Sequence, residues 1–292
     1  MFSGRTATLF SATAMMICAP AFAQAADQPT EISAEEITRT VKTMTLDQFE
    51  GRAPGTAGED RTIGYLIGRF EALGLEPGGV DGTWTQPVPL LHTALGTPDR
   101  LSFSSKGKST ALHAGKDIYV STLQPRDRAV VEDAEMVFVG YGVTASERGW
   151  DDYKDVDLKG KVAVFLVNDP DFAAASDEAV ADKFGGRAMT YYGRWTYKFE
   201  EASRRGAVAA LIIHETEAAG YGWSVVESPQ GENYGIAKPD GEMTSLALQG
   251  WISDEAAQKL FDGAGLDLAK LRVAARKSDF KPVAIDSKFA AS

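Results

Sequence analysis

The chain has 292 residues with a formal net charge of −11, and 44% of them are hydrophobic. This length and composition are typical of a globular protein that buries a sizeable core, in one large domain or two modest ones. The acidic balance argues against a nucleic-acid partner, because nucleic-acid binding calls for a basic face.

Residues 1–23 have the pattern of a secretory signal peptide. Arg5 is followed by an apolar run that ends in a small-x-small cleavage site, Ala21-Phe22-Ala23. The run is too short for a membrane span, which needs roughly 20 strongly apolar residues, and no later stretch is long enough. We therefore expect an exported protein, periplasmic or secreted. Because Cys18 is the only cysteine, the mature chain can form no disulfide and no zinc–thiolate site.

Two amphipathic helices are predicted next. Ser33 and Glu36 have the spacing of a capping box, and apolar residues follow at helical intervals. A second helix should begin after Thr56 and end at Gly74, a candidate C′ glycine. Its apolar stripe consists of Ile63, Leu66, Ile67, Phe70 and Leu73.

The stretch between these helices, FEGRAPGTAGED (residues 49–60), is rich in glycine. Glycine-rich loops before helices often hold phosphate, because free backbone N–H groups point at the ligand there. This stretch has neither the lysine nor the spacing of a phosphate-binding loop, and no strand precedes it. We interpret it as a turn followed by a capped helix start.

From about residue 101 the pattern changes to that of strands, rich in Val, Phe and Tyr. A helix over 197–205 followed by an apolar strand over 207–213 predicts a buried parallel pair with the strand 162–167. We also expect a loop over 220–241. The fold class predicted is therefore mixed α/β. The other predicted elements are strands at 101–103 and 136–143, an extended segment at 84–91, and short helices at 254–261 and 267–275.

Candidates for catalysis are few. The only histidines are His92, His113 and His214, and none lies in a catalytic motif. A triad could still form in space, but we interpret each histidine as structural. His214, Glu215 and Glu217 could present metal ligands at a strand end, although a zinc site would need a further ligand. A polar strand end is the simpler interpretation.

An acidic cluster precedes the strand 162–167. It suggests calcium, but the EF-hand pattern is not met. We interpret it as a solvated turn with Trp150 and Tyr153 packed beneath it. The cluster consists of Asp151, Asp152, Asp155 and Asp157. The residues alone therefore assign no catalytic, cofactor-binding or metal-binding residue.

Four blocks in order resemble one known family. GRAPGTAGEDRTIGYLIGRFEALGLEPGG with WTQPVPL resembles the N-terminal segment of secreted zinc aminopeptidases of the M28 type. MVFVGYGVTASERGWDDYKDVDLKGKVAVFLVNDPDF is similar to the start of the protease-associated (PA) domain inserted in many such enzymes. YKFEEASRRGAVAALIIHE resembles a helix and strand of that domain, and GWISDEAAQKLFDGAGLDLAKL with FKPVAI its closing segment. The resemblance runs from about residue 35 to 286.

The resemblance implies four segments. They are a signal peptide (1–23), the N-terminal helical segment of a zinc-peptidase domain (24–100), a β-rich PA-like domain (101–275) and the start of the return to the catalytic domain (276–292). In the full-length family enzyme two zinc ions, held by two histidines and three acidic residues, activate the water that attacks the peptide. Those ligands follow the inserted domain. The three histidines here match no ligand motif, so no ligand is carried over and no cofactor is expected in this chain.

The resemblance thus implies the N-terminal and PA-domain portion of an exported aminopeptidase, truncated and inactive alone, from an enzyme that removes N-terminal residues of peptides. Its first helices would lack the sheet that they normally cover. We therefore expect their apolar stripe to be exposed, causing poor solubility or requiring a complementing peptidase fragment. The alternatives are a stand-alone PA-domain module that binds peptides or a partner peptidase, and an unrelated hydrolase that uses His214.

Overall fold

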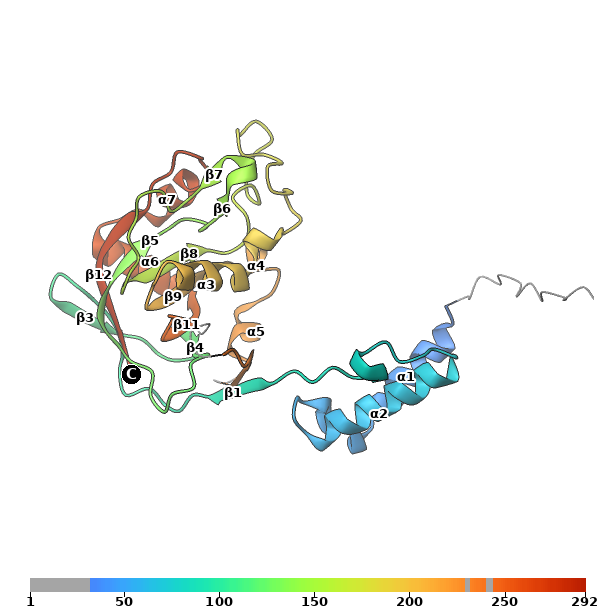
Figure 1. Ribbon diagram of the computed structural model, residues 1–292. Helices are drawn as coiled ribbons and strands as arrows, with labels where there is room; N and C mark the ends of the chain where they lie inside the picture. Colours follow the sequence, from blue (N-terminus) through green and yellow to red (C-terminus); the bar gives the residue numbers. More distant parts are fainter. Residues whose placement is uncertain (1–31, 229–231, 240–243) are drawn as a thin grey trace, which may run out of the picture. The chain divides into compact units, whose positions relative to one another are not determined.

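The computed structural model describes residues 32–228, 232–239 and 244–292. The expected signal peptide, residues 1–23, lies outside them. The chain divides into two compact units, Met1–Gln86 and Pro87–Ser292 (Figure 1). Within the described ranges, none of the helices is long and apolar enough to cross a membrane.

The first unit ends at Gln86, whereas we expected the boundary between the two units after residue 100. Strand β1 (Leu90–Ala94) pairs with β10 (Glu232–Ile236), a strand of the second unit. The backbone N–H of Asp99 also donates to the carbonyl of Ser292 at 2.8 Å. These backbone hydrogen bonds tie residues 90–99 to the second unit.

The first unit contains helices α1 (Ala34–Met44) and α2 (Ala57–Ala72), with 3₁₀ turns at Asp47–Arg52 and Val80–Gly82. The predicted caps are confirmed. The Ser33 hydroxyl accepts from the Glu36 N–H at 3.3 Å, and Thr56 accepts from Glu59. Gly74 adopts a φ of 73°, which lets Leu75 N–H reach back to the Phe70 carbonyl at 3.1 Å and close the helix.

The glycine-rich stretch brings the first 3₁₀ turn against α2. Phe49 is buried there, and a Cβ added at Gly58 would lie 2.2 Å from the Phe49 carbonyl oxygen. The Glu59 carboxylate accepts from the Gly55 N–H at 2.6 Å, so a side chain of this chain occupies that backbone donor. The stretch is a close helix–turn contact, as the interpretation of a turn and a helix start predicts.

The apolar stripe of α2 is only partly covered. Ile63, Leu66 and Ile67 are half-buried, whereas Phe70 and Leu73 are 41% and 68% exposed. The predicted exposure is therefore confirmed at the C-terminal end of the stripe and is wrong for its first half.

The second unit is built on a mixed sheet, so the predicted α/β class is confirmed. Neighbouring strands from β5 to β11 run parallel, and the other pairs are antiparallel. The predicted parallel pair of 162–167 and 207–213 is confirmed. Across the sheet the order is β3 (Lys108–Ala111), β2 (Leu101–Ser105), β12 (Val283–Ala291), β5 (Val131–Phe138), β8 (Val162–Leu166), β9 (Ala209–His214), β11 (Leu248–Ser253) and β4 (Ile118–Ser121).

Helices cover both faces of this sheet (Figure 1). Because side chains alternate along a strand, β8 sends Val164 to one core cluster and Phe165 to the other. The first cluster includes Phe261 of α6 (Asp254–Ala264) and Leu268 of α7 (Leu268–Ala274), and the second includes Phe199 of α3 (Trp195–Arg204). Short helices α4 (Thr216–Ala219) and α5 (Trp223–Glu227) and the small strands β6 (Thr144–Ala145) and β7 (Trp150–Asp151) complete the unit.

Three expectations are corrected here. Residues 276–292 were expected to leave for another domain, but β12 lies inside the sheet between β2 and β5, with Phe289 fully buried. The strand expected to end at residue 143 ends at Phe138, because Gly140 and Gly142 adopt φ values of 67° and 65° that no strand allows. The loop expected over 220–241 contains α5 and β10.

Candidate functional site

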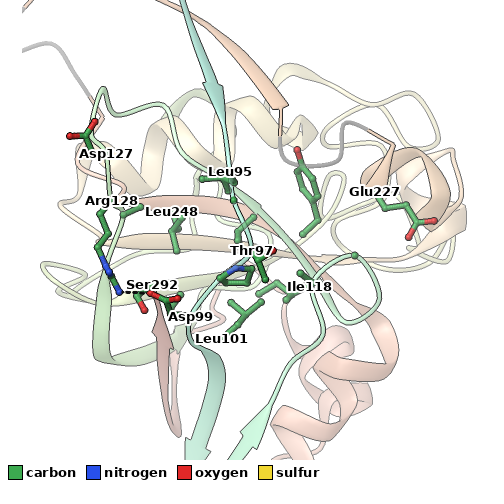
Figure 2. Close-up of a pocket in the computed structure, with 18 of the residues that line it drawn as sticks. Leu95, Thr97, Asp99, Leu101, Ile118, Asp127, Arg128, Glu227, Leu248 and Ser292 are labelled. Carbon is green, nitrogen blue, oxygen red and sulfur yellow. Dashed lines mark hydrogen bonds and ion pairs between the residues drawn. The ribbon is translucent and has the colours of Figure 1, made fainter.

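The second unit contains a cavity of about 850 Å³ (Figure 2). Its apolar wall comes from residues that the sheet holds rigidly: Leu101 of β2, Ile118 of β4 and Leu248 of β11 are all buried. Leu95 and Ala129, from two loops, extend this wall. Its volume and mixed lining are within the range of sites that bind small molecules or peptide side chains.

Charged groups border the cavity. Asp99 and Arg128 form an ion pair at 2.9 Å and so neutralise each other. Asp127 and Glu227 lie on opposite sides in Figure 2, and neither has a cationic partner within 4 Å in the described part of the chain. The cavity therefore has an apolar wall and two exposed, unpaired carboxylates at opposite margins, which suits a ligand with an apolar group and a positive charge at one end.

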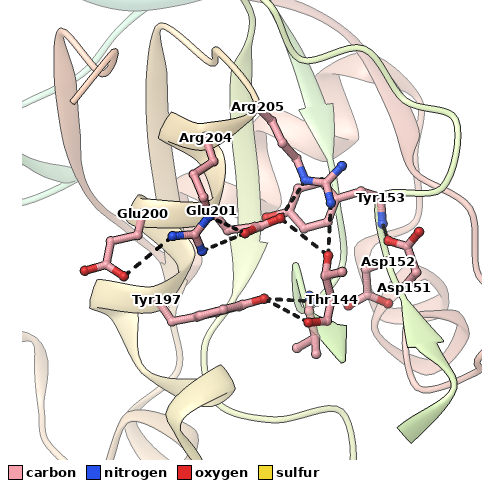
Figure 3. A network of polar contacts seen from close by, with 10 residues as sticks. Thr144, Asp151, Asp152, Tyr153, Tyr197, Glu200, Glu201, Arg204 and Arg205 are labelled. Carbon is pink, nitrogen blue, oxygen red and sulfur yellow. Dashed lines mark hydrogen bonds and ion pairs between the residues drawn. The ribbon is translucent and has the colours of Figure 1, made fainter. Parts of the chain in front are cut away.

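A network of polar side chains is centred on α3, outside the cavity (Figure 3). Glu201 accepts hydrogen bonds from Arg204 and Arg205, each with its Nε 2.8 Å away. Arg205 also donates to the Thr144 hydroxyl at 3.0 Å, and its guanidinium lies 3.8 Å from the centre of the Tyr153 ring. The charges of Glu201, Arg204 and Arg205 are paired with one another, so the network joins α3 to β6 as a structural link.

The expectation of a solvated turn is wrong for Asp152. Trp150 and Tyr153 are buried as predicted, but Asp152 itself is only 1% exposed. Its carboxylate accepts from Trp150 Nε1 at 2.7 Å and from the backbone N–H of Val143 at 2.9 Å. Burial raises the pKa of Asp152 to about 7, although these hydrogen bonds oppose the shift.

This burial makes stability depend on pH. The unfolded carboxyl group titrates near pH ~4, whereas folded Asp152 keeps its proton up to about pH 7. The stabilisation that the proton supplies is therefore complete below ~4 and is lost as the pH rises toward 7, by at most about 1.4 kcal/mol per pH unit. We expect the stability advantage of the wild type over Asp152→Asn to shrink across this window.

Urea unfolding of both proteins at several pH values between 4 and 8 measures this difference. Asp155→Asn, at an exposed aspartate of the same turn, is the matched control and should follow the wild type. A difference between wild type and Asp152→Asn that stays constant or grows with pH would contradict the assignment.

Lys198 is a buried cation that the sequence analysis missed. Its ammonium donates to the carbonyls of Tyr141 at 2.5 Å, Asn168 at 3.1 Å and Tyr192 at 3.4 Å. Burial lowers the pKa of Lys198 to about 8, against the attraction of Asp169 and Asp152. A signal was present, because Lys198 precedes the buried Ala202 by one helical turn on the same face of α3.

Two aspartates fix the long loop after β8. Asp171 accepts from the backbone N–H groups of Phe184, Gly185 and Gly186 at 2.7, 3.0 and 2.9 Å. Asp169 accepts from the N–H and the hydroxyl of Thr190. These carboxylates cross-link the loop through its own backbone, and Lys198 joins it to the carbonyl of Tyr141 after β5, so all three groups have a structural task.

The histidines do not meet in one site. His92 stacks on Tyr234 with ring centres 4.5 Å apart, and His113 pairs with Asp117 at 2.8 Å. His214 is buried and its Nε2 lies 3.1 Å from the Tyr221 carbonyl. Burial lowers the pKa of His214, although that hydrogen bond opposes the shift. The structural interpretation of His214 agrees with this packing, in which the ring lies 5.5 to 5.9 Å from those of Tyr221, Trp223 and Trp251.

The possible metal ligands after β9, Glu215 and Glu217, each pair with a different arginine. Glu215 pairs with Arg272 at 3.2 Å, and Glu217 with Arg187 at 2.8 Å. Among the residues that the structure describes, no group of three or more His, Cys, Asp or Glu side chains is arranged to hold a metal ion. The donor set of these residues does not fit the zinc pair of the resembled family.

Comparisons with known proteins found no matching family model and no matching curated protein. Solved structures similar to the chain include an aminopeptidase from Aneurinibacillus sp. strain AM-1, at 16% identity and a TM-score of 0.35, over 89% of this chain and 44% of that one. Another is BSAP, a zinc aminopeptidase from Bacillus subtilis, at 16% identity and a TM-score of 0.27, over 87% and 43%. This chain thus spans less than half of either structure, and TM-scores below 0.5 do not establish a common fold.

Proposed function

We propose that this chain is the N-terminal segment and PA-domain portion of an exported M28-type metallo-aminopeptidase. Its second unit would bind peptide in the cavity of Figure 2 without hydrolysing it. The observation that carries the binding role is the cavity itself, with its apolar wall and the unpaired carboxylates of Asp127 and Glu227. A peptide N-terminus supplies the matching groups, since it has an ammonium beside its first side chain.

The order of the sequence blocks supports the family assignment. The first block contributes α2 to the helical unit, and the three PA-like blocks contribute β5 to β8, α3 with β9, and β11 to β12 of the second unit. These segments are far apart in sequence, yet they are neighbours in one sheet. This coherence is what a domain made of the three blocks requires.

Calorimetric titration with the tripeptide Leu-Ala-Ala tests the proposed binding site. We expect binding of the free peptide and about tenfold weaker binding after N-acetylation, which removes the positive charge. Ala129→Trp fills the cavity from a half-buried position and should weaken binding by a similar factor. Ala173→Trp, at an exposed alanine outside the cavity, is the matched control.

The variants Asp127→Asn and Glu227→Gln show which carboxylate binds the peptide ammonium. Only the variant that removes that carboxylate should weaken binding of the free peptide. Equal affinity of the free and acetylated peptides, or of wild type and Ala129→Trp, would exclude the cavity as the binding site.

A second candidate function is that of a partner module for a separate peptidase fragment. The exposed end of the α2 stripe favours it, since Leu73 is 68% exposed. Co-purification of this chain with a peptidase fragment encoded downstream would support the role. Loss of that complex in Leu73→Asp would assign the contact to α2.

A further inference from the structure

A second cavity, of about 550 Å³, lies in the second unit and shares no lining residue with the one proposed to bind peptide N-termini. It lies between the β2–β3 hairpin, the turn at 113–117 and α6. Its floor is apolar, with Phe103, Ala256 and Leu260 almost fully buried. We call it the lysine groove, because its rim carries Lys106, Lys108, Lys116 and Lys259.

The lysine groove has an excess of positive charge. Lys259 pairs with Glu255 at 2.7 Å, and Asp117, the one carboxylate of the lining, pairs with His113. Lys106, Lys108 and Lys116 have no carboxylate within 4 Å in the described ranges. In a chain with a net charge of −11, this concentration of unneutralised lysines favours an anionic ligand.

The wall of the groove is an open sheet edge. Strand β3 ends the strand order, and all four of its residues are exposed. Leu112 N–H donates to the Leu101 carbonyl at 2.9 Å, so Thr110 and Lys108, at even spacing from Leu112, also turn their backbone groups toward β2. The N–H and C=O groups of Ser109 and Ala111 therefore point to the open side.

The side chains of β3 place a lysine beside this open edge, on the face that α6 covers. Thr110 pairs with Phe103, whose side chain lies in the core cluster beneath α6. Residues opposite each other share a face, and so do residues two apart on one strand. Lys108 thus lies on the same face as α6, at the side of the open edge.

We propose that the lysine groove binds an extended acidic peptide, which adds to β3 as a further strand. Its backbone would pair with Ser109 and Ala111, while carboxylates on alternate residues, roughly 7 Å apart, would face the lysines. Lysines on an edge strand normally repel further strands. The same charges make the edge selective for a strand that carries the opposite charge.

A fluorescein-labelled peptide Glu-Val-Glu-Val-Glu-Val-Glu tests this proposal by fluorescence anisotropy with the full chain. We expect binding that weakens at least about tenfold in the triple variant Lys106→Gln, Lys108→Gln, Lys116→Gln. The double variant Lys277→Gln, Lys281→Gln, which removes exposed lysines outside the groove, should bind within about twofold of wild type.

The variant Ser109→Pro distinguishes binding by strand addition from binding by charge attraction alone. This change removes an N–H from the open edge and keeps every lysine, and proline is tolerated at such edge positions. We expect it to weaken binding at least about tenfold with an unchanged circular dichroism spectrum. Undiminished binding by Ser109→Pro, equal loss in the control double variant, or displacement by tripolyphosphate as effective as by unlabelled peptide would overturn the proposal.

Discussion

Replacing Lys198 with methionine is expected to lower the free energy of unfolding of the second unit by about 3 kcal/mol. Methionine keeps most of the length and volume of the side chain but donates no hydrogen bond. The carbonyls of Tyr141 and Asn168 then remain buried, and that of half-buried Tyr192 partly so, without the ammonium that they share. Each unsatisfied buried acceptor costs roughly 1–3 kcal/mol, partly offset because no charge has to be buried.

Urea unfolding followed by circular dichroism measures this loss. Lys183→Met is the matched control, because Lys183 is exposed and its change should stay within about 0.5 kcal/mol. A loss below about 1 kcal/mol for Lys198→Met would mean that the ammonium does not hold the loop after β8 to the sheet.

Gly58→Ala is expected to separate α2 from the 3₁₀ turn before it. An alanine in a helix normally stabilises it by up to about 1 kcal/mol relative to glycine. Here the added Cβ would lie 2.2 Å from the Phe49 carbonyl oxygen, a backbone atom that cannot rotate away. We expect a net destabilisation of about 2–3 kcal/mol, with exposure of Phe49.

Gly64→Ala and Gly68→Ala, on the same helix, are the matched controls. An added Cβ meets no atom within 4 Å at either position, so both should stabilise α2. Amide hydrogen exchange over residues 57–72 reads out the helix directly: faster exchange in Gly58→Ala and slower exchange in the controls. If Gly58→Ala behaves like the controls, the close contact with Phe49 does not exist in solution.

Local features of the fold were predictable because they depend on neighbouring residues. Ser33 and Thr56 begin helices through hydrogen bonds within four residues, and Gly74 ends one through its own φ. The parallel pair β8–β9 was also predictable, since two apolar strands joined by a helix have few other ways to bury their faces.

Sheet order was not predictable in the same way. Strand β12 alternates weakly in hydrophobicity, and only its pairing with β2 and β5, more than a hundred residues earlier, identifies it. Polar burial was missed for a related reason. Asp152 is drawn into the interior by Trp150 and Val143, and Lys198 by three backbone carbonyls, partners that sequence patterns do not show.

The candidate sites depend even more on three-dimensional assembly. Asp127 and Glu227 are a hundred residues apart, and neither lies in a motif. The resemblance to a family implied no ligand residue in this chain, so the cavity and the lysine groove emerged only from the packing of the second unit.

The proposal that this chain binds peptide without hydrolysing it is tested most directly by release of 4-nitroaniline from leucine 4-nitroanilide in the presence of added zinc. A zinc aminopeptidase of known activity serves as the positive control in the same buffer. The proposal predicts no release above the buffer blank at any concentration of the chain. Release that rises in proportion to the chain and stops on addition of a chelator would contradict it.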